Sequence, residues 1–316
     1  MAEFILRRLL AAIPILLIVT LISASIMQLV PGDPAAVIAG QGATNEEIQR
    51  VRDQLGLDRS FVERLAEWYV GLARGDLGHS LFLNRSVWQA IIERVPVTLA
   101  LTGAALLLTV LLGVPAGVIA ALRPNSWVDQ AVLTLALLGV SVPNFWLSLM
   151  LIVLFGVLLD WLPTGGYVPF ADDPVGWARS LVLPAVSLAL LQVGLLARIT
   201  RATMLEVLRQ DYVRTARAKG LPRLLVVGKH ALKNVMIPVV TVIGISVGLL
   251  LSGSVVIETV YSIPGMGRLL ATAIFSRDYP VIQGGLLVTA ATLVVLNLIV
   301  DLLYAALDPR VTYDRR

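Results

Sequence analysis

Few residues in this chain could do chemistry on their own. The sequence has two histidines, His79 and His230, and no cysteine. Without cysteine there is no thiolate metal site and no thiol redox chemistry. The topology derived below puts the histidines on opposite sides of a membrane, so they cannot share a metal or an acid–base site. We therefore predict no catalytic residue, no metal ligand and no enzyme.

Nucleotide binding has no support in the motifs either. No G-x-x-x-x-G-K-[ST] phosphate loop occurs, and the nearest fragment, Gly228-Lys229, is followed by His and lacks the upstream glycine. The chain is expected to bind no cofactor. If it moves a solute uphill, the energy must come from another subunit.

Polar residues inside the apolar stretches are sparse. A transporter driven by an ion gradient usually carries intramembrane acids or bases and internal repeats. Here Gln192 lies mid-stretch, and Asn297 and Asp301 lie near a stretch end. Pro143 removes one helical hydrogen bond, which predicts either a packing kink or a bend that lines a pathway and exposes Asn144 to solute. Pro143, Asn144 and Gln192 are the candidate pathway residues.

Residues 211–234 form the most basic part of the chain, with Asp211 as the single acid. Residues 203–219 contain no Pro or Gly, which predicts an uninterrupted helix that Gly220 and Pro222 then stop. A second helix is expected from about Arg223. On the first helix, we expect basic and apolar sides. The basic side holds Arg209, Arg214 and Arg217, with Val213 among them, and the apolar side holds Leu208, Tyr212 and Ala216.

This basic segment has two interpretations. It could be an anchor that lies on anionic lipid, where each base contributes about 1 kcal/mol. It could instead be a docking surface, because an anchor does not need two helices separated by a glycine.

The composition predicts a helical membrane protein. The 316 residues are 57% hydrophobic and 15% charged, against about 25% charged in soluble domains. No period-two alternation typical of a membrane barrel occurs. We read the first apolar run as a retained anchor, because it is longer than a signal core. The predicted spans are residues 9–30, 97–122, 131–159, 181–199, 235–257 and 284–306.

The distribution of Lys and Arg predicts that both termini and residues 200–234 lie in the cytoplasm, because basic residues favour the inner side of short loops. The membrane topology therefore explains the excess of Lys and Arg over Asp and Glu, and we expect no nucleic acid partner. The predicted organisation has three parts. They are an N-terminal segment with the first span (1–30), an extracytoplasmic helical region (31–96) and a five-helix core (97–316).

The extracytoplasmic parts are expected to be short helices and turns. "TNEE" at 44–47 and "SFVE" at 60–63 fit the capping box and predict two amphipathic helices. These helices either cap the membrane face or dock a soluble partner. Residues 160–180 should be mostly turns. "YSIPGMGR" at 261–268 predicts a turn, with a short helix over 269–276.

Ten stretches, in order along nearly the whole chain, resemble one family: the inner-membrane permease subunits of dipeptide and oligopeptide ABC importers, with relatives for glutathione and nickel. The stretches are "PGDP", "LGLD", "GDLGHS", "VPVTL", "SVPNFW", "WLPTGG", "DYVRTARAKGL", "HALKNVMIPVVT", "ETVYSIPGMGR" and "RDYP".

The resemblance implies an all-α, six-span permease of the type I importer fold in the bacterial inner membrane. It also implies a second homologous permease, two ATPase subunits that hold ATP and Mg, an extracytoplasmic solute-binding protein and surrounding lipid. The family's cytoplasmic "EAA" loop seats on the ATPase. Its Glu position is Arg214 here, and its glycine is Gly220. The coupling residues implied are Asp211, Tyr212, Arg214, Thr215, Ala216, Arg217, Lys219, Gly220 and Leu221.

We therefore expect ATP-driven uptake of di- or oligopeptides by alternating access. Import of nickel or glutathione by the same machinery, a gradient-driven transporter and a receptor-like membrane protein are the alternatives. The loop at 261–268 either reaches the binding protein or is a plain surface turn. Its candidate contacts are Tyr261, Pro264, Gly265 and Met266.

Overall fold

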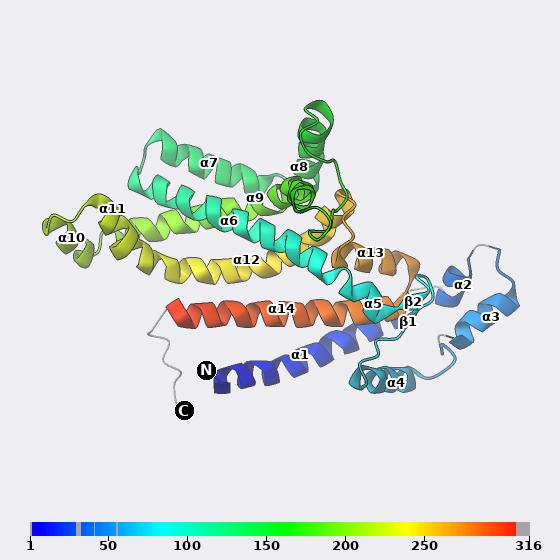
Figure 1. Cartoon of the computed structure of the whole chain (residues 1–316). Coiled ribbons are helices and arrows are strands. Elements are labelled where there is room, and N and C mark those ends of the chain that lie inside the picture. Colours follow the sequence, from blue (N-terminus) through cyan, green and yellow to red (C-terminus); the bar gives the residue numbers. More distant parts are fainter. Residues whose placement is uncertain (1, 30–32, 41, 55, 308–316) are drawn as a thin grey trace. The chain divides into compact units, whose positions relative to one another are not determined.

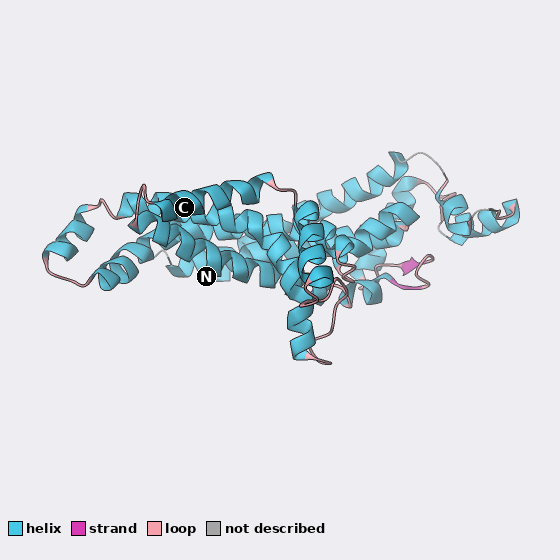
Figure 2. Ribbon diagram, turned by 90° about the horizontal axis from the view of Figure 1, so that it is seen from above, coloured by secondary structure: helices cyan, strands magenta, loops and turns pink. Residues whose placement is uncertain are grey.

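The computed structural model describes residues 2–29, 33–40, 42–54 and 56–307 (Figure 1). The described chain is helical apart from one short hairpin (Figure 2). Three sequence features reach beyond the described residues: the end of the first predicted span at residue 30, the start of "PGDP" at 31 and the start of "LGLD" at 55.

The chain divides into two compact units. Unit 1 comprises Met1–Thr98 and Pro264–Val295, and unit 2 comprises Leu99–Ile263 and Leu296–Arg316. These units are defined by compactness, whereas the three parts expected from the sequence are defined by their position relative to the membrane. The three-part organisation therefore stays a prediction.

Unit 1 is built from short elements around the ends of longer helices. Its elements are α1 (Ala2–Leu29), α2 (Pro34–Ala39), α3 (Asn45–Gln54), α4 (Phe61–Ala73), β1 (His79–Ser80), β2 (Arg85–Ser86), α5 (Val87–Ile92), α13 (Met266–Ser276) and most of α14 (Tyr279–Leu307).

Local capping explains where α3 and α4 begin. The Ser60 side chain accepts from the backbone N–H of Glu63 at 3.3 Å, and the Glu63 carboxylate accepts from the Ser60 N–H at 3.0 Å. Thr44 and Glu47 make the same reciprocal pair before α3. Both predicted capping boxes are confirmed, and each satisfies two amides that a helix start leaves free.

A buried apolar cluster holds the rest of unit 1 together. Leu77 and α5 supply one side of it, and α13 and the start of α14 supply the other, so residues from the two separate chain segments of unit 1 share one core. Its buried members are Leu77, Val87, Ala90, Ile91, Met266, Leu269, Ala273 and Val281. The short helix predicted over 269–276 is therefore α13, which starts three residues earlier.

Unit 2 contains the longest helices. Its elements are most of α6 (Val95–Leu122), α7 (Trp127–Ser141), α8 (Asn144–Leu151), η1 (Ile152–Leu158), α9 (Pro174–Val207), α10 (Asp211–Ala218), α11 (Arg223–Leu225), η2 (Val226–Ala231) and α12 (Leu232–Val260).

Helix α9 is the centre of unit 2 and packs against α7, α8 and α12. Two glycines allow the close approach. A Cβ on Gly117 of α6 would lie 2.4 Å from the Ala197 carbonyl oxygen of α9, and one on Gly194 of α9 would lie 2.7 Å from that of Ala136. Small residues at such crossings let membrane helices pack backbone to backbone.

Among the described residues, five helices are long and apolar enough to cross a membrane, and α7 with α8–η1 forms a sixth span if the bent pair counts as one. The helical, polytopic class is confirmed. The fourth span is longer than predicted and begins at Pro174, inside the stretch expected to be turns. The Asp173 carboxylate accepts from Val175 N–H at 3.0 Å, so an Asp-Pro helix start was overlooked.

Candidate functional site

The basic segment folds differently from its predicted uninterrupted helix. α9 ends at Val207, residues 208–210 form a turn, and α10 begins at Asp211. The turn is closed by i→i−3 bonds, from Arg209 N–H to Glu206 O and from Gln210 N–H to Val207 O, both 3.1 Å. The absence of Gly and Pro permits a continuous helix but does not require one, and here packing favours the turn.

A small apolar cluster anchors α10 to the neighbouring helices. Its buried members are Val213, Ala216 and Val226, with Val207, Leu208 and Leu221 packed against them. These residues come from the end of α9, from α10 and from the start of η2. Because Leu208 and Val213 both pack into this cluster, the chain must turn between them.

The predicted faces of α10 need one correction. Val213 is fully buried, whereas Tyr212, which we expected on the apolar side, is 43% exposed. The Tyr212 hydroxyl accepts from Asn234 Nδ2 at 2.9 Å, which links α10 to α12. Val213 therefore anchors the helix, and Tyr212 belongs to its outer surface.

The outer surface of α10 is polar and exposed. Arg214 and Asp211 lie 3.6 Å apart with both side chains largely in solvent, and such a pair contributes little to stability. The predicted coupling residues with exposed positions are Asp211, Tyr212, Arg214, Thr215, Arg217, Lys219 and Gly220. Ala216 is buried, so it positions the helix and is not part of this surface.

Gly220 makes the turn that ends α10. Its φ is +75°, a left-handed conformation that glycine adopts without strain. Its N–H donates to Arg217 O at 2.9 Å, and Leu221 N–H donates to Ala216 O at 3.4 Å. No atom lies within 4 Å of a Cβ built there, so the requirement is for the dihedral and not for space. Pro222 then caps α11.

An ion pair that sequence reasoning missed joins the start of α7 to α9. Asp129 is 2% exposed and binds the Arg201 guanidinium through both oxygens, one of them at 2.6 Å from Nη2. Its carboxylate also accepts from Asn125 N–H at 2.9 Å. The pattern "SWVD", with Ser126 as the cap, was the available signal.

The predicted kink at Pro143 is a break between two helices. α7 and the α8–η1 helix meet at 105°. Val142 and Pro143 have extended ψ values of 122° and 133°, as expected for proline and the residue before it. Asn144 starts α8 and is half-buried, and its carbonyl accepts from Ser148 Oγ at 2.8 Å. Its role in a pathway stays a prediction.

Gln192 lies in the packed centre of unit 2. It is 2% exposed and accepts from Ser246 Oγ at 3.3 Å, so it links α9 to α12. In this conformation its side chain faces a neighbouring helix. Its assignment to the pathway stays a prediction.

Tyr261 is a buried connector in unit 2. Its hydroxyl lies 2.9 Å from Ser187 Oγ and donates to Ser148 O at 3.3 Å, while its own carbonyl accepts from Gly166 N–H at 2.8 Å. Burial raises the pKa of this hydroxyl, against the effect of its hydrogen bonds. The side chain is 1% exposed in this structure, and its contact with a binding protein stays a prediction.

In unit 1, the candidate contact Met266 is also buried, and its contact stays a prediction too. Its side chain is 5% exposed within the apolar cluster, and its N–H donates to Thr98 Oγ1 at 2.8 Å. Gly265 is buried as well, and Pro264 is exposed. Of the four candidate contacts, Pro264 alone presents a side chain on the surface.

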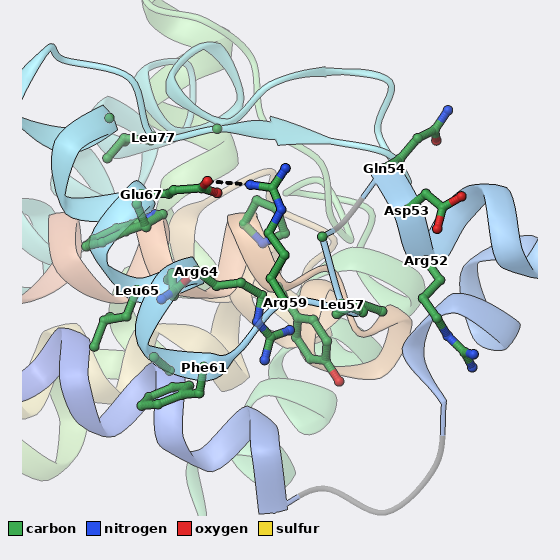
Figure 3. A pocket seen from close by; sticks show the side chains of 18 of the residues that line it. Arg52, Asp53, Gln54, Leu57, Arg59, Phe61, Arg64, Leu65, Glu67 and Leu77 are labelled. Carbon is green, nitrogen blue, oxygen red and sulfur yellow. Dashed lines mark hydrogen bonds and ion pairs between the residues drawn. The ribbon is translucent and has the colours of Figure 1, made fainter.

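A cavity of about 730 Å³ lies among α3, α4 and the start of α14 in unit 1 (Figure 3). Arg59 pairs with Glu67 at its rim, and Arg52 Nη2 lies 2.5 Å from Asp33 Oδ2. Arg64 also lines it. Acids and bases are mixed here, so the cavity does not favour one sign of ligand.

A buried polar contact ties the hairpin of unit 1 to the loop before α14. Ser80 is fully buried and donates from Oγ to the Asp278 carboxylate, and Leu83 N–H donates to the same hydroxyl at 2.9 Å. Burial raises the pKa of Asp278, although the Ser80 hydrogen bond acts in the opposite direction. Neither residue was singled out from the sequence, because the pairing is long-range.

Among the residues described, no group of three or more His, Cys, Asp or Glu could hold a metal ion. The site around α10 is a short helix with a buried anchor, a polar outer surface and a glycine turn. Two spanning helices connect to it directly, so it is suited to transmit movement.

Several helices that are long and apolar enough to cross a membrane define a multi-pass membrane protein. Two family descriptions match the chain. "Binding-protein-dependent transport system inner membrane component" matches residues 113–313, and the corresponding N-terminal family matches residues 1–102. The chain belongs to the family of binding-protein-dependent transport system inner membrane components.

Relatives match over the full length. A putative peptide transport system permease protein of Brucella abortus is 50% identical over 314 residues, covering 99% of this chain and 100% of the relative. The di/tripeptide transport system permease protein of Pseudomonas aeruginosa is 41% identical, with both chains fully covered. The glutathione transport system permease protein of Escherichia coli is 42% identical over 99% of this chain and 100% of its own length.

The solved inward-facing MetNI methionine ABC transporter has a similar fold. Its TM-score is 0.57 at 19% identity, and the match covers 70% of this chain and 97% of that one. The resemblance to permeases of peptide ABC importers and the type I importer permease fold are thus confirmed.

Proposed function

We propose that this chain is the permease subunit of an ABC importer that takes up di- or oligopeptides delivered by an extracytoplasmic binding protein. The family is binding-protein-dependent, and the relatives at 50% and 41% identity are named for peptide and di/tripeptide transport. Glutathione is the second candidate solute, because a glutathione permease is 42% identical. Glutathione is itself a small peptide, so the two candidates share a chemical class.

The main support for the coupling mechanism is the way in which α10 packs against its neighbours. The buried Val213 and Ala216 fix the helix to the end of α9 and to η2, while its polar surface stays exposed. A partner that moves α10 therefore moves the helices that carry it. ATP binding by two ATPase subunits would shift α10 and reorient the spans of this chain and of a second permease. The ATP and Mg belong to the ATPase subunits.

The direct test of the proposed function is reconstitution with partners. The chain, its companion permease, the ATPase pair and the binding protein are placed in liposomes, and uptake of a labelled dipeptide is measured. We expect uptake only with ATP and the binding protein present. Uptake by this chain alone, driven by an ion gradient without ATP, would support a secondary transporter instead. Competition by unlabelled glutathione separates the two candidate solutes.

We also propose that both termini and α10 face the cytoplasm of the bacterial inner membrane. The chain has no cysteine, so a single introduced cysteine is a unique label. Thr215 in α10 and Asp172 in the loop before α9 are both exposed, and the proposed topology puts them on opposite sides of the membrane. In intact cells, an impermeant maleimide should label Asp172→Cys and spare Thr215→Cys. The reverse pattern would overturn the orientation.

A further inference from the structure

A second cavity, of about 720 Å³, lies in unit 2 beside the apolar cluster that anchors α10. The end of α6 supplies Leu122 to its wall, the following turn supplies Asn125, and the last part of α9 supplies Arg201 and Leu205. Most of the remaining wall comes from residues around α10 and η2. Figure 1 shows α10 and α11 at the same end of unit 2 as the turn between α6 and α7.

The charge of this cavity is strongly one-sided. Four arginines line it, Arg201, Arg209, Arg217 and Arg223, and the described lining residues include no carboxylate. Arg201 is neutralised by Asp129. Arg223 donates to the Leu122 carbonyl at 3.2 Å, which fixes its position, and no carboxylate among the described residues pairs with it.

Arg209 and Arg217 are in the same situation. Both are exposed residues, and no carboxylate pairs with either within the part of the chain that the structure describes. Three positive charges therefore converge on one cavity without a counter-charge, which favours an anionic occupant.

The remaining wall is apolar. It includes Leu205, Leu208 and Leu221, together with Val226 and Val227. A wall of leucine and valine next to arginines fits a molecule with an anionic head and an apolar body. The cavity also lies at one end of α6 and α9, two of the helices that are long and apolar enough to cross a membrane.

We propose that this cavity binds the phosphate of an anionic phospholipid. Arginine suits this ligand, because its planar guanidinium donates two parallel hydrogen bonds to phosphate oxygens. Basic pockets between spanning helices are known to take phospholipid headgroups. A lipid bound here would contact both the α6–α7 turn and the apolar cluster that anchors α10. The lipid leaflet would therefore help to fix the position of α10.

The test compares two pairs of substitutions in the full-length chain. The cavity pair is Arg209→Gln with Arg217→Gln. The control pair is Arg214→Gln with Lys219→Gln, which removes the same charge from the same segment at positions outside the cavity. Each protein is placed in phosphatidylcholine nanodiscs, and binding of a fluorescent phosphatidylglycerol is titrated.

We expect the cavity pair to weaken binding by roughly 30-fold, the effect of removing two bases near a lipid surface, and the control pair to leave it nearly unchanged. Arg209→Lys with Arg217→Lys should keep most of the binding, which separates loss of charge from loss of folding. Equal weakening by the cavity and control pairs would overturn the proposal, because it would indicate a diffuse basic surface.

Two other results would also overturn it. If inorganic phosphate displaces the lipid probe completely, the cavity is a small-anion site and not a lipid site. If the cavity pair binds the probe normally but no longer binds the purified ATPase subunits, the arginines contact an acidic protein surface instead.

Discussion

Asp278 and Ser80 illustrate how single residues hold unit 1 together. Both are buried, and they join the hairpin after α4 to the start of α14, which lie far apart in the sequence. Short-range patterns predicted the capping boxes at Thr44 and Ser60, because each partner lies three residues away. They could not predict this contact, since nothing local in "GHS" or "RDYP" specifies the other stretch.

Burial of Asp278 predicts a pH dependence of stability. The pKa of this carboxyl is raised above its ordinary value of 3.8, so the native state keeps the proton at pH values where the unfolded chain has lost it. Stability should therefore fall as the pH rises from about 4 through the raised pKa. Thermal unfolding across this range should show that Asp278→Asn lacks this component. Parallel curves for the two proteins would contradict the assignment.

The ion pair between Asp129 and Arg201 predicts a stability loss at the other unit. Asp129→Asn leaves the Arg201 charge largely buried and should cost about 3 kcal/mol, reduced somewhat because Arg201 keeps a fifth of its side chain exposed. The double variant with Arg201→Gln should lose less than the sum of the single changes. Melting temperatures of all four proteins check this, and strict additivity would mean that the pair is not coupled.

At the scale of elements, the sequence predicted the spanning helices well but the segment between α9 and α12 only in part. Apolar runs of sufficient length leave few alternatives in lipid, so helix type follows directly. The turn at 208–210 and the anchoring role of Val213 depend on where Val226 lies after the chain reverses. That placement is a tertiary fact, and propensity alone favoured a longer helix.

Close helix packing at Gly117 gives a matched test within α6. A Cβ on Gly117 would collide with the backbone of α9, whereas one on Gly103 of the same helix would meet nothing within 4 Å. Gly117→Ala should destabilise the protein by about 1–3 kcal/mol through overpacking. Gly103→Ala should be neutral or slightly stabilising. The two melting temperatures decide this, and equal effects would mean that α6 and α9 are not in such close contact.

The Gly220 turn gives a second test. Gly220→Val forces a β-branched residue to φ +75° and should disturb the packing that anchors α10. Asparagine tolerates this conformation, so Gly220→Asn should not. We expect normal membrane insertion for both. Binding-protein-stimulated ATP hydrolysis and uptake should fall at least severalfold for Val and stay near normal for Asn. Normal stimulation in a well-expressed Val variant would exclude a coupling role for this turn.

At the scale of the whole molecule, the sequence was sufficient for class and family because ten short motifs occur in order over nearly the whole chain. The contacts expected for Tyr261 and Met266 stay predictions. Both belong to a stretch that looks polar, yet both side chains are buried. Tyr261 packs within unit 2, and Met266, the first residue of α13, packs within unit 1, while Pro264 is exposed. A motif identifies a loop without saying which side chains it exposes.

We propose that the ATPase subunits act on this chain through the outer surface of α10. It is tested most directly by the rate at which a maleimide modifies Thr215→Cys in nanodiscs, with and without the ATPase pair, because Thr215 is exposed on that surface and the chain has no other cysteine. Asp172→Cys is the control. We predict that the ATPase pair slows modification at Thr215→Cys at least tenfold and leaves Asp172→Cys unchanged. An unchanged rate at Thr215→Cys in an assembled complex would contradict the account.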